Sequence, residues 1–336
     1  MKKNIPITAF LMLCISVSSF LTSCRNAPSY ATTTVPALSV GIQNSPSNAL
    51  IIVADAQKLF DSTKVKVTIK DFAAGKLALQ AMLGQANDLD VASSAETPVV
   101  LASLGGNALK VFAQVVNAKN ECRVVVHKDA ARTTPETYFS VKRKLATSQG
   151  GSPEWLTYNF INRYKLDRSK VEIVAVEPAN MPATLTSKAV DAISIFDPFA
   201  RIGEQQLGDK GQTFLNDNIT TYYVLSAKNQ TLEQKPAAVA AFTEGLRKAQ
   251  AFILAEPETA KKIVAARTKL DINIINDTWK NYTFGVEIDA DFFQLCQDQA
   301  NWAITTGKYT KETKIPDFRQ IVSSTALKPT VTQPVH

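Results

Sequence analysis

Short apolar or alternating runs recur along the chain, and they predict strands separated by helices. In the first half, strands are predicted at 38–42, 65–69, 89–92, 109–116 and 123–127. In the second half, they are predicted at 144–147, 171–176, 192–196, 213–215 and 221–226. Segments with apolar residues on one helical face predict helices at 76–83, 153–164, 179–187, 237–255, 258–270 and 291–305. Strands that alternate with helices in this way are typical of α/β proteins with parallel sheets.

Four junctions between a predicted strand and a predicted helix share one construction. Each places a residue that can cap a helix directly before a proline, at Ser45-Pro46, Thr97-Pro98, Ser152-Pro153 and Asp197-Pro198. A cap side chain accepts the first free amides, and proline is tolerated at the first helical position. In open α/β sheets, ligands bind beyond the carboxyl ends of the strands, against such helix starts. A single pair of this kind is also common at helix starts that bind nothing. The four junctions together therefore indicate the α/β architecture more strongly than they indicate a ligand site.

The first residues of the chain have the pattern of a targeting segment. Lys2 and Lys3 precede an uncharged, largely apolar stretch over 5–21, which ends in Leu-Thr-Ser-Cys at 21–24. This order predicts a signal peptide over 1–23, and its last four residues resemble a bacterial lipobox in which Cys24 is lipidated. The alternative is an uncleaved membrane anchor with an incidental cysteine, for which a stretch of about 17 residues is short. Residues 24–37 are predicted to form a flexible tether.

The amino-acid composition excludes several classes of function. The 336 residues, 45% of them apolar, fit two lobes better than one core. The net charge of +7 is mild, and the basic residues are not interleaved with aromatic ones, so no nucleic-acid partner is expected. Two histidines and four cysteines without a C-x-x-C pair exclude multi-histidine chemistry and a thiolate zinc site. We therefore expect no metal and no cofactor. Cys122 and Cys296 either pair in an oxidising compartment or remain two separate buried thiols.

Several short motifs follow one another in an order that is similar to a known family. They are Phe-Ala-Ala-Gly at 72–75, Ala-Met-Leu-Gly-Gln at 81–85, Asp-Val-Ala at 90–92, Glu-Thr-Pro at 96–98, the segment 144–152, and Asp-Ala-Ile at 191–193 through Phe-Asp-Pro-Phe at 196–199. Between about residues 38 and 318, the chain resembles the substrate-binding proteins of ABC importers for nitrate, taurine and aliphatic sulfonates. It departs from the family at 140–144, where Ser-Val-Lys-Arg-Lys replaces an acidic-Leu-Lys-Gly-Lys turn.

The resemblance implies the type II periplasmic-binding-protein fold, in which two α/β lobes, each a mostly parallel sheet flanked by helices, are joined by two crossing strands. The crossings are expected near 124–128 and 222–226. The first lobe would comprise 38–125 and 225–320, the second 126–224, and a tail 321–336. The late helices are expected to pack on the first lobe.

By the same resemblance, the protein would be an exported, lipid-anchored monomer on a bacterial membrane. It would clamp a small solute between its lobes and deliver that solute to an ABC permease in the inner membrane, without catalysis. A structural or signalling lipoprotein that kept this fold is an alternative. An enzyme like the thiamine-pyrimidine synthases, which share the fold, is less consistent, because their chemistry uses histidine and a cysteine-rich motif.

Twelve residues at the ends of the predicted strands are the candidate ligand contacts. They are Gln43, Asn44, Ser45, Ser94, Ala95 and Glu96 on the first lobe, and Gln149, Gly150, Gly151, Ser152, Phe196 and Asp197 on the second. The glycines allow close backbone approach, and the free amides near Ser152 favour an anionic group. The set contains no Arg or Lys and two carboxylates, Glu96 and Asp197. It therefore predicts a taurine-like ligand with an acidic group and an amine, although a cationic or neutral aromatic nitrogen compound fits nearly as well.

Each candidate also has a purely structural interpretation. Ser45, Ser152 and Asp197 would serve as plain helix caps. Glu96 would be a solvated carboxylate at the rim of a cleft, because Thr97 already provides the cap. Phe196 would be a core residue, as aromatic residues at strand ends often are.

Overall fold

The computed structural model describes residues 35–86, 89–216 and 219–323. The predicted signal peptide, the lipidation site Cys24, most of the tether and most of the tail lie outside the described residues. No described helix has the length and apolarity that a membrane span requires.

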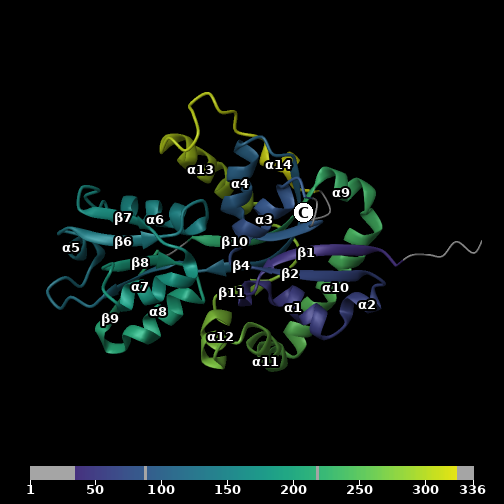
Figure 1. The fold of residues 1–336 in the computed structure, drawn as a ribbon, viewed down its shortest axis with the longest axis horizontal. Coiled ribbons are helices and arrows are strands. Elements are labelled where there is room, and N and C mark those ends of the chain that lie inside the picture. The colour runs from purple at the N-terminus through teal and green to yellow at the C-terminus, as the bar shows by residue number, and fades with distance from the viewer. Residues whose placement is uncertain (1–34, 87–88, 217–218, 324–336) are drawn as a thin grey trace, which may run out of the picture. The chain divides into compact units, whose positions relative to one another are not determined.

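The first sheet has the strand order β11-β4-β10-β3-β1-β2 (Figure 1). Its strands are β1 (Ala37–Gln43), β2 (Lys66–Phe72), β3 (Val91–Ala95), β4 (Leu109–Lys119), β10 (Thr220–Lys228) and β11 (Tyr282–Phe284). Strand β1 runs parallel to β2 and β3, whereas β10 runs antiparallel to β3 and β4, and β11 antiparallel to β4. The short strand β11 was not predicted from the hydrophobic pattern.

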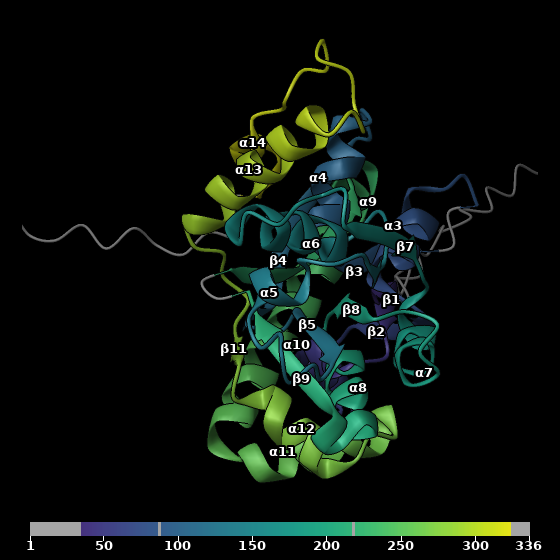
Figure 2. The same ribbon diagram turned by 90° about the vertical axis from the view of Figure 1, so that its left-hand side faces the viewer.

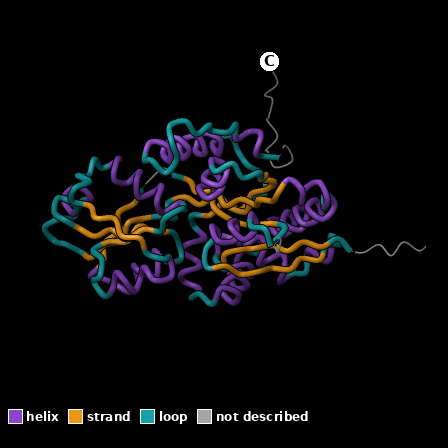
Figure 3. Tube along the Cα trace, turned by 45° about the horizontal axis from the view of Figure 1, so that its top comes forward, coloured by secondary structure: helices purple, strands orange, loops and turns teal. Residues whose placement is uncertain are grey.

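The second sheet has the order β7-β6-β8-β5-β9. It comprises β5 (Arg123–His127), β6 (Arg143–Thr147), β7 (Val171–Ala175), β8 (Ala192–Ile195) and β9 (Gly211–Leu215). Strand β6 is parallel to β7 and β8, and β5 lies antiparallel between β8 and β9. Each sheet thus runs mostly in one direction but is mixed. The antiparallel strands are β10 and the edge strand β11 in the first sheet, and β5 in the second. Figure 3 shows the strands in orange. We call each sheet with its covering helices a lobe.

Helices cover both faces of the first sheet (Figure 2). One face buries apolar side chains of α1 (Ala49–Ala56), α2 (Leu59–Ser62), α10 (Pro236–Ala255), α11 (Pro257–Thr268) and α12 (Ile272–Trp279). The other buries those of α3 (Gly75–Leu83), α4 (Glu96–Leu104), α13 (Asp291–Thr305) and α14 (Phe318–Ile321). The late helices α10 to α14 therefore return to the first lobe. Helix α9 (Asn229–Gln234) follows β10 directly.

The second lobe has the same layered construction. Its apolar clusters include residues of α5 (Pro135–Tyr138) and α6 (Ser152–Arg163) in one set, and of α7 (Met181–Thr186) and α8 (Phe199–Leu207) in the other. Short 3₁₀ turns, η1 (Pro46–Asn48), η2 (Pro178–Asn180) and η3 (Gly208–Lys210), complete the described elements. The expected α/β architecture of two sheets flanked by helices is confirmed.

The chain passes between the sheets a few residues earlier than expected. It leaves the first sheet after Lys119 and enters the second at Arg123, and it returns between Leu215 and Thr220. The expected crossing at 124–128 therefore falls in and just after β5, and the one at 222–226 lies inside β10. The strand pairing sets these limits. Arg123 already pairs with Leu215 in the second sheet, and Thr220 already pairs with Lys119 in the first.

The expected helix caps are not made. Ser45 occupies the N-cap position of η1, but its hydroxyl contacts that of Ser47 instead of a backbone amide. Thr97 and Ser152 lie inside the first turns of α4 and α6, and Asp197 precedes the proline that caps α8. The side chains of Thr97, Ser152 and Asp197 are engaged elsewhere, as the site below shows.

Of the two alternatives for the cysteines, the structure supports separate thiols. Cys122 and Cys296 are both free and buried, and burial raises the pKa of each thiol well above its ordinary value. Both belong to the same apolar cluster of the first lobe, where they pack as small hydrophobic residues.

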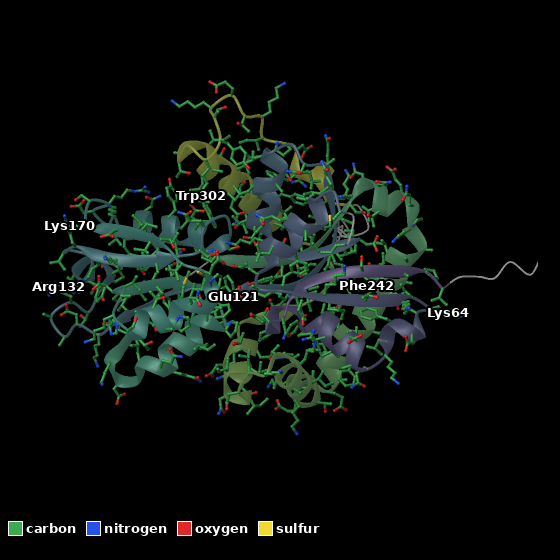
Figure 4. All side chains as sticks on the ribbon, in the orientation of Figure 1. Lys64, Glu121, Arg132, Lys170, Phe242 and Trp302 are labelled. Carbon is green, nitrogen blue, oxygen red and sulfur yellow. The ribbon has the colours of Figure 1, made fainter. Side chains whose placement is uncertain are left out.

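Phe242 on α10 lies in the core between the first sheet and its helices (Figure 4). Its substitution therefore tests the packing of this core. It is fully buried and stacks on Phe60, with ring centroids 5.1 Å apart. We expect Phe242→Ala to lower the free energy of unfolding by about 3–5 kcal/mol, measured in urea. Leu254→Ala on the same helix, where the side chain is 73% exposed, should change it by less than about 0.5 kcal/mol. Equal effects of the two substitutions would contradict the packing described here.

Candidate functional site

A narrow cavity of about 30 Å³ lies where strand-to-helix junctions of the two lobes meet. It is lined by Gln43, Ala74, Gly75, Lys76, Ala95, Pro98 and Tyr223 from the first lobe, and by Ser148, Gly151, Ser152, Pro153, Pro178 and Phe196 from the second. The junctions that follow the parallel strands β1, β2, β3, β6 and β8 contribute most of these residues. Because the carboxyl ends of parallel strands share one edge of a sheet, side chains far apart in sequence converge there.

Three helices begin at this cavity. The first residues of α3 are Gly75 and Lys76, the N-cap of α4 is Ala95, and the N-cap of α6 is Gly151. A helix N-terminus carries unpaired amides and partial positive charge. The start of α3 lies so close to β3 that a Cβ on Gly75 would stand 2.9 Å from the Cα of Ser94. Three N-termini around one small space favour a negatively charged ligand group.

Lys76 adds a full positive charge and joins the lobes. Its Nζ donates to Ser148 Oγ at 3.2 Å and to the carbonyl oxygen of Gln149 at 2.9 Å, and it lies 3.9 Å from Oε1 of Glu177. Lys76 belongs to α3 of the first lobe, whereas its partners belong to the second. The expectation of a cleft without Arg or Lys is therefore replaced by a cavity that has a lysine in its wall.

Five of the twelve predicted contacts line the cavity: Gln43, Ala95, Gly151, Ser152 and Phe196. Ser152 also meets the first lobe, because its Oγ is 3.2 Å from the Oγ1 of Thr97. Phe196 lies against the cavity and packs edge-to-face on Phe199, with ring centroids 5.7 Å apart. Phe196 therefore both lines the cavity and packs against another aromatic residue.

Five further predicted residues flank the cavity without lining it, and each has at least one polar group with a protein partner. Asn44 donates to the carbonyl of Arg267, Ser45 contacts Ser47, Ser94 donates to the carbonyl of Ala95, the carbonyl of Gln149 accepts from Lys76, and the amide of Gly150 donates to Glu154 at 2.8 Å. Gly150 has φ +71°, a left-handed conformation that glycine adopts without strain.

Glu96 is neither a solvated rim carboxylate nor part of the cavity lining. It is 1% exposed; its Oε2 accepts the backbone amide of Tyr222 at 2.8 Å, and its Oε1 accepts from Gln299 at 2.7 Å. Burial raises the pKa of Glu96 above its ordinary value. This carboxyl group joins α4, β10 and α13 inside the first lobe, so its oxygens are not available to a ligand amine.

Asp197 is likewise committed to the protein. It is buried and forms an ion pair with Arg123 at the start of β5, and Arg201 Nε lies 4.0 Å from its Oδ2. Arg123 also pairs with Glu204 on α8, at 3.2 Å from Nε to Oε1. These groups hold β5 against α8 within the second lobe. The predicted pairing of a ligand amine with Glu96 or Asp197 finds no support in the arrangement.

Three polar lining residues were not predicted: Lys76, Ser148 and Tyr223. Ser148 directly precedes the predicted contacts 149–152. Lys76 opens a helix after a strand, but its junction has no proline and so lacked the shared signature. Tyr223 lies within a correctly located strand and lines the cavity, and its hydroxyl donates to Glu121 at 3.0 Å. Within the described lining there is no Asp, Glu, His or Cys. Nor do the described residues contain a cluster of three or more side chains suited to a metal ion.

Two helix-flanked mixed sheets with a cavity between their strand ends define an α/β protein of the two-lobe periplasmic-binding-protein fold. Solved structures with this fold are similar over most of their length. The periplasmic aliphatic sulphonate binding protein SsuA of Escherichia coli matches with a TM-score of 0.70 and 19% identity, over 86% of this chain and 97% of that one. The alkanesulfonate-binding protein SsuA of Xanthomonas axonopodis pv. citri, bound to MOPS, matches with a TM-score of 0.70 and 17% identity, over 86% and 98%. The periplasmic nitrate-binding protein NrtA of Synechocystis PCC 6803 matches with a TM-score of 0.65 and 15% identity, over 86% of both chains.

The sequence itself matches the model of the NMT1-like family over residues 31–268. The chain therefore belongs to the NMT1-like family. No curated protein sequence matches it significantly. The resemblance inferred from the sequence motifs is confirmed at the level of family and fold.

If Asp197 stabilises the second lobe instead of contacting a ligand, its substitution should lower the free energy of unfolding. Asp197→Ala would leave Arg123 buried without its main partner, so we expect a loss of about 3–5 kcal/mol in the free energy of unfolding. Asp277→Ala removes an exposed ion pair, with Lys280, and should cost less than about 1 kcal/mol. Guanidinium denaturation of both variants provides the comparison. An Asp197 variant as stable as the Asp277 variant would contradict the framework role.

Proposed function

We propose that this protein is the solute-binding lipoprotein of an ABC importer, and that it clamps a small organic anion with an apolar body between its lobes. The observation that carries the proposal is Lys76 beside three helix N-termini, in a cavity whose described lining has no carboxylate. The similar solved proteins are named as binders of sulfonates and nitrate, which supports the same class of solute.

The walls supply the apolar part of the recognition. Phe196, Tyr223 and three prolines line the space. When the lobes part to admit a solute, its apolar body would bury its surface against them. An ammonium group on the solute would find no carboxylate partner there, and burying an unpaired charge is costly. The proposal therefore favours a plain anion over a taurine-like zwitterion.

Closure of the lobes would complete the site. Lys76 and Thr97 of the first lobe already contact Ser148 and Ser152 of the second. On the neighbouring side, Lys308 pairs with Glu154 at 2.6 Å. A solute that touches both lobes binds the closed form better than an open one, and so shifts the population toward it.

We further propose that the solute is released unchanged. The lining offers one ammonium group, one amide and three hydroxyl groups, from Lys76, Gln43, Ser148, Ser152 and Tyr223. Nucleophilic catalysis needs a base next to the nucleophile. Glu96 and Asp197 are bound to protein donors, and Glu177 lies 3.9 Å from the ammonium of Lys76. Binding, transfer to a permease and return as a monomer are the simplest use of such a cavity.

A ligand series tests the proposed solute class. We expect benzenesulfonate to raise the melting temperature and to bind in calorimetry more tightly than neutral benzenesulfonamide or zwitterionic taurine. Lys76→Met should weaken benzenesulfonate binding about ten- to a hundredfold, because a charge-assisted hydrogen bond is lost. Lys76→Arg should retain part of the affinity.

Lys66→Met serves as the matched control, because Lys66 is an exposed lysine on β2 outside the cavity. Equal binding of the sulfonamide and the sulfonate, or an unchanged affinity in Lys76→Met, would contradict the anion proposal. Stabilisation by none of these solutes would count against solute binding of this class altogether.

The lipid anchor is tested at the N-terminal region. We expect Cys24→Ala to move the protein from the membrane pellet to the soluble fraction, because the thiol that would carry the lipid is removed. Cys14→Ala, which changes a cysteine within the apolar stretch, should leave the protein in the pellet. Retention of the Cys24 variant in the pellet would exclude the lipoprotein assignment.

A further inference from the structure

Glu121 is a buried carboxyl group in the segment that crosses from the first sheet to the second (Figure 4). It is 1% exposed, and its Oε1 accepts hydrogen bonds from the hydroxyls of Tyr223 at 3.0 Å and Tyr282 at 2.8 Å. Its Oε2 is buried and has no hydrogen-bond partner among the described residues. No part of the proposed solute site uses this group directly, because Glu121 does not line the cavity.

The link to the cavity is Tyr223. Tyr223 lines the cavity, and its hydroxyl donates to Glu121. The carboxyl group therefore stands directly behind a residue of the cavity wall. A change of charge on Glu121 would act on a solute through Tyr223 and through the low dielectric of the buried wall.

The charges around Glu121 do not balance an ionised carboxylate. The groups that face it or adjoin it are Tyr223 on β10, Tyr282 on β11, Asp197 before α8, Glu96 on α4, and its chain neighbours Cys122 and Arg123. The one cation in this set, Arg123, is committed to Asp197 and Glu204. Burial and the nearby Asp197 raise the pKa of Glu121 to about 8, although the two tyrosine donors oppose the shift.

We propose that Glu121 is a positioning residue for solute binding, whose carboxyl group holds Tyr223 at the cavity wall and on ionising disfavours an anionic solute. The inference rests on the proposed function, because it requires an anion in the cavity. The sign follows from linkage. An anion beside the wall stabilises the protonated carboxyl group, so by reciprocity the protonated form binds the anion more tightly.

Affinity should therefore fall as the pH rises through about 8. Benzenesulfonate is a suitable probe, since its own charge stays constant over this range. In calorimetry we expect its affinity to drop on the order of fivefold between about pH 6.5 and about pH 9.5. Near the midpoint, binding should take up protons, which shows as an enthalpy that depends on the ionisation heat of the buffer.

Two variants separate positioning from a general structural effect. Glu121→Gln keeps an acceptor for the tyrosine hydroxyls but cannot ionise, so its affinity should be nearly flat over the same range. Tyr282→Phe removes one donor that stabilises the carboxylate without touching the cavity lining, so the midpoint should move to higher pH. Glu172→Gln, at an exposed position on β7, controls for the change in net charge and should keep the wild-type profile.

The outcomes are distinguishable. If benzenesulfonate binds with the same pH profile in the wild type and in Glu121→Gln, the inference is overturned and the proposed function stands. If the profile is flat in the wild type, the inference is likewise overturned. Absence of binding at every pH would count against both.

Discussion

The structure depends on burying ionisable groups where the chain crosses between its two sheets. Over three residues, from Glu121 to Arg123, an acid anchored in the first lobe is followed by a base anchored in the second. Burial of such groups is tolerated only with hydrogen-bonding or ionic partners. The two tyrosines that hold Glu121 and the two acids that hold Arg123 therefore fix how the crossing segment leaves one sheet and enters the other. The cavity takes its position from this segment, because Tyr223 and Phe196 adjoin the anchored groups.

The hydrophobic pattern predicted much of the fold because strand burial is a local property of the sequence. The run Val124-Val125-Val126 lies in β5, and the apolar face of 237–255 became the buried face of α10. The crossings were placed too late, since the pattern shows that a strand is buried but not which sheet buries it. Strand β11 was missed because three residues at the edge of a sheet leave too short a period to detect.

The candidate site was predicted less well, and for a physical reason. Position at a strand end predicts that a residue lies near the ligand edge, but it does not predict where the side chain points. Glu96 and Asp197 lie at the expected junctions, yet each found a buried partner, Gln299 or Arg123, from distant parts of the sequence. Lys76 directly follows the motif at 72–75, but nothing in the sequence shows that its side chain contacts Ser148 across the lobes.

These assignments make the lining of the cavity more positive than the sequence predicted. The two carboxylates expected in the wall lie behind it, where protein donors or cations engage them, and a lysine and three helix N-termini face the space instead. Yet the ammonium of Lys76 is already bound to a hydroxyl and a carbonyl of the second lobe. An anion must share or replace those bonds, so its net gain is smaller than a free lysine would offer. The same contacts also favour closure by themselves, which reduces what the solute must contribute to hold the lobes together. A carrier that must release its solute to a partner gains from both effects, because selectivity for charge is kept while the binding energy stays moderate.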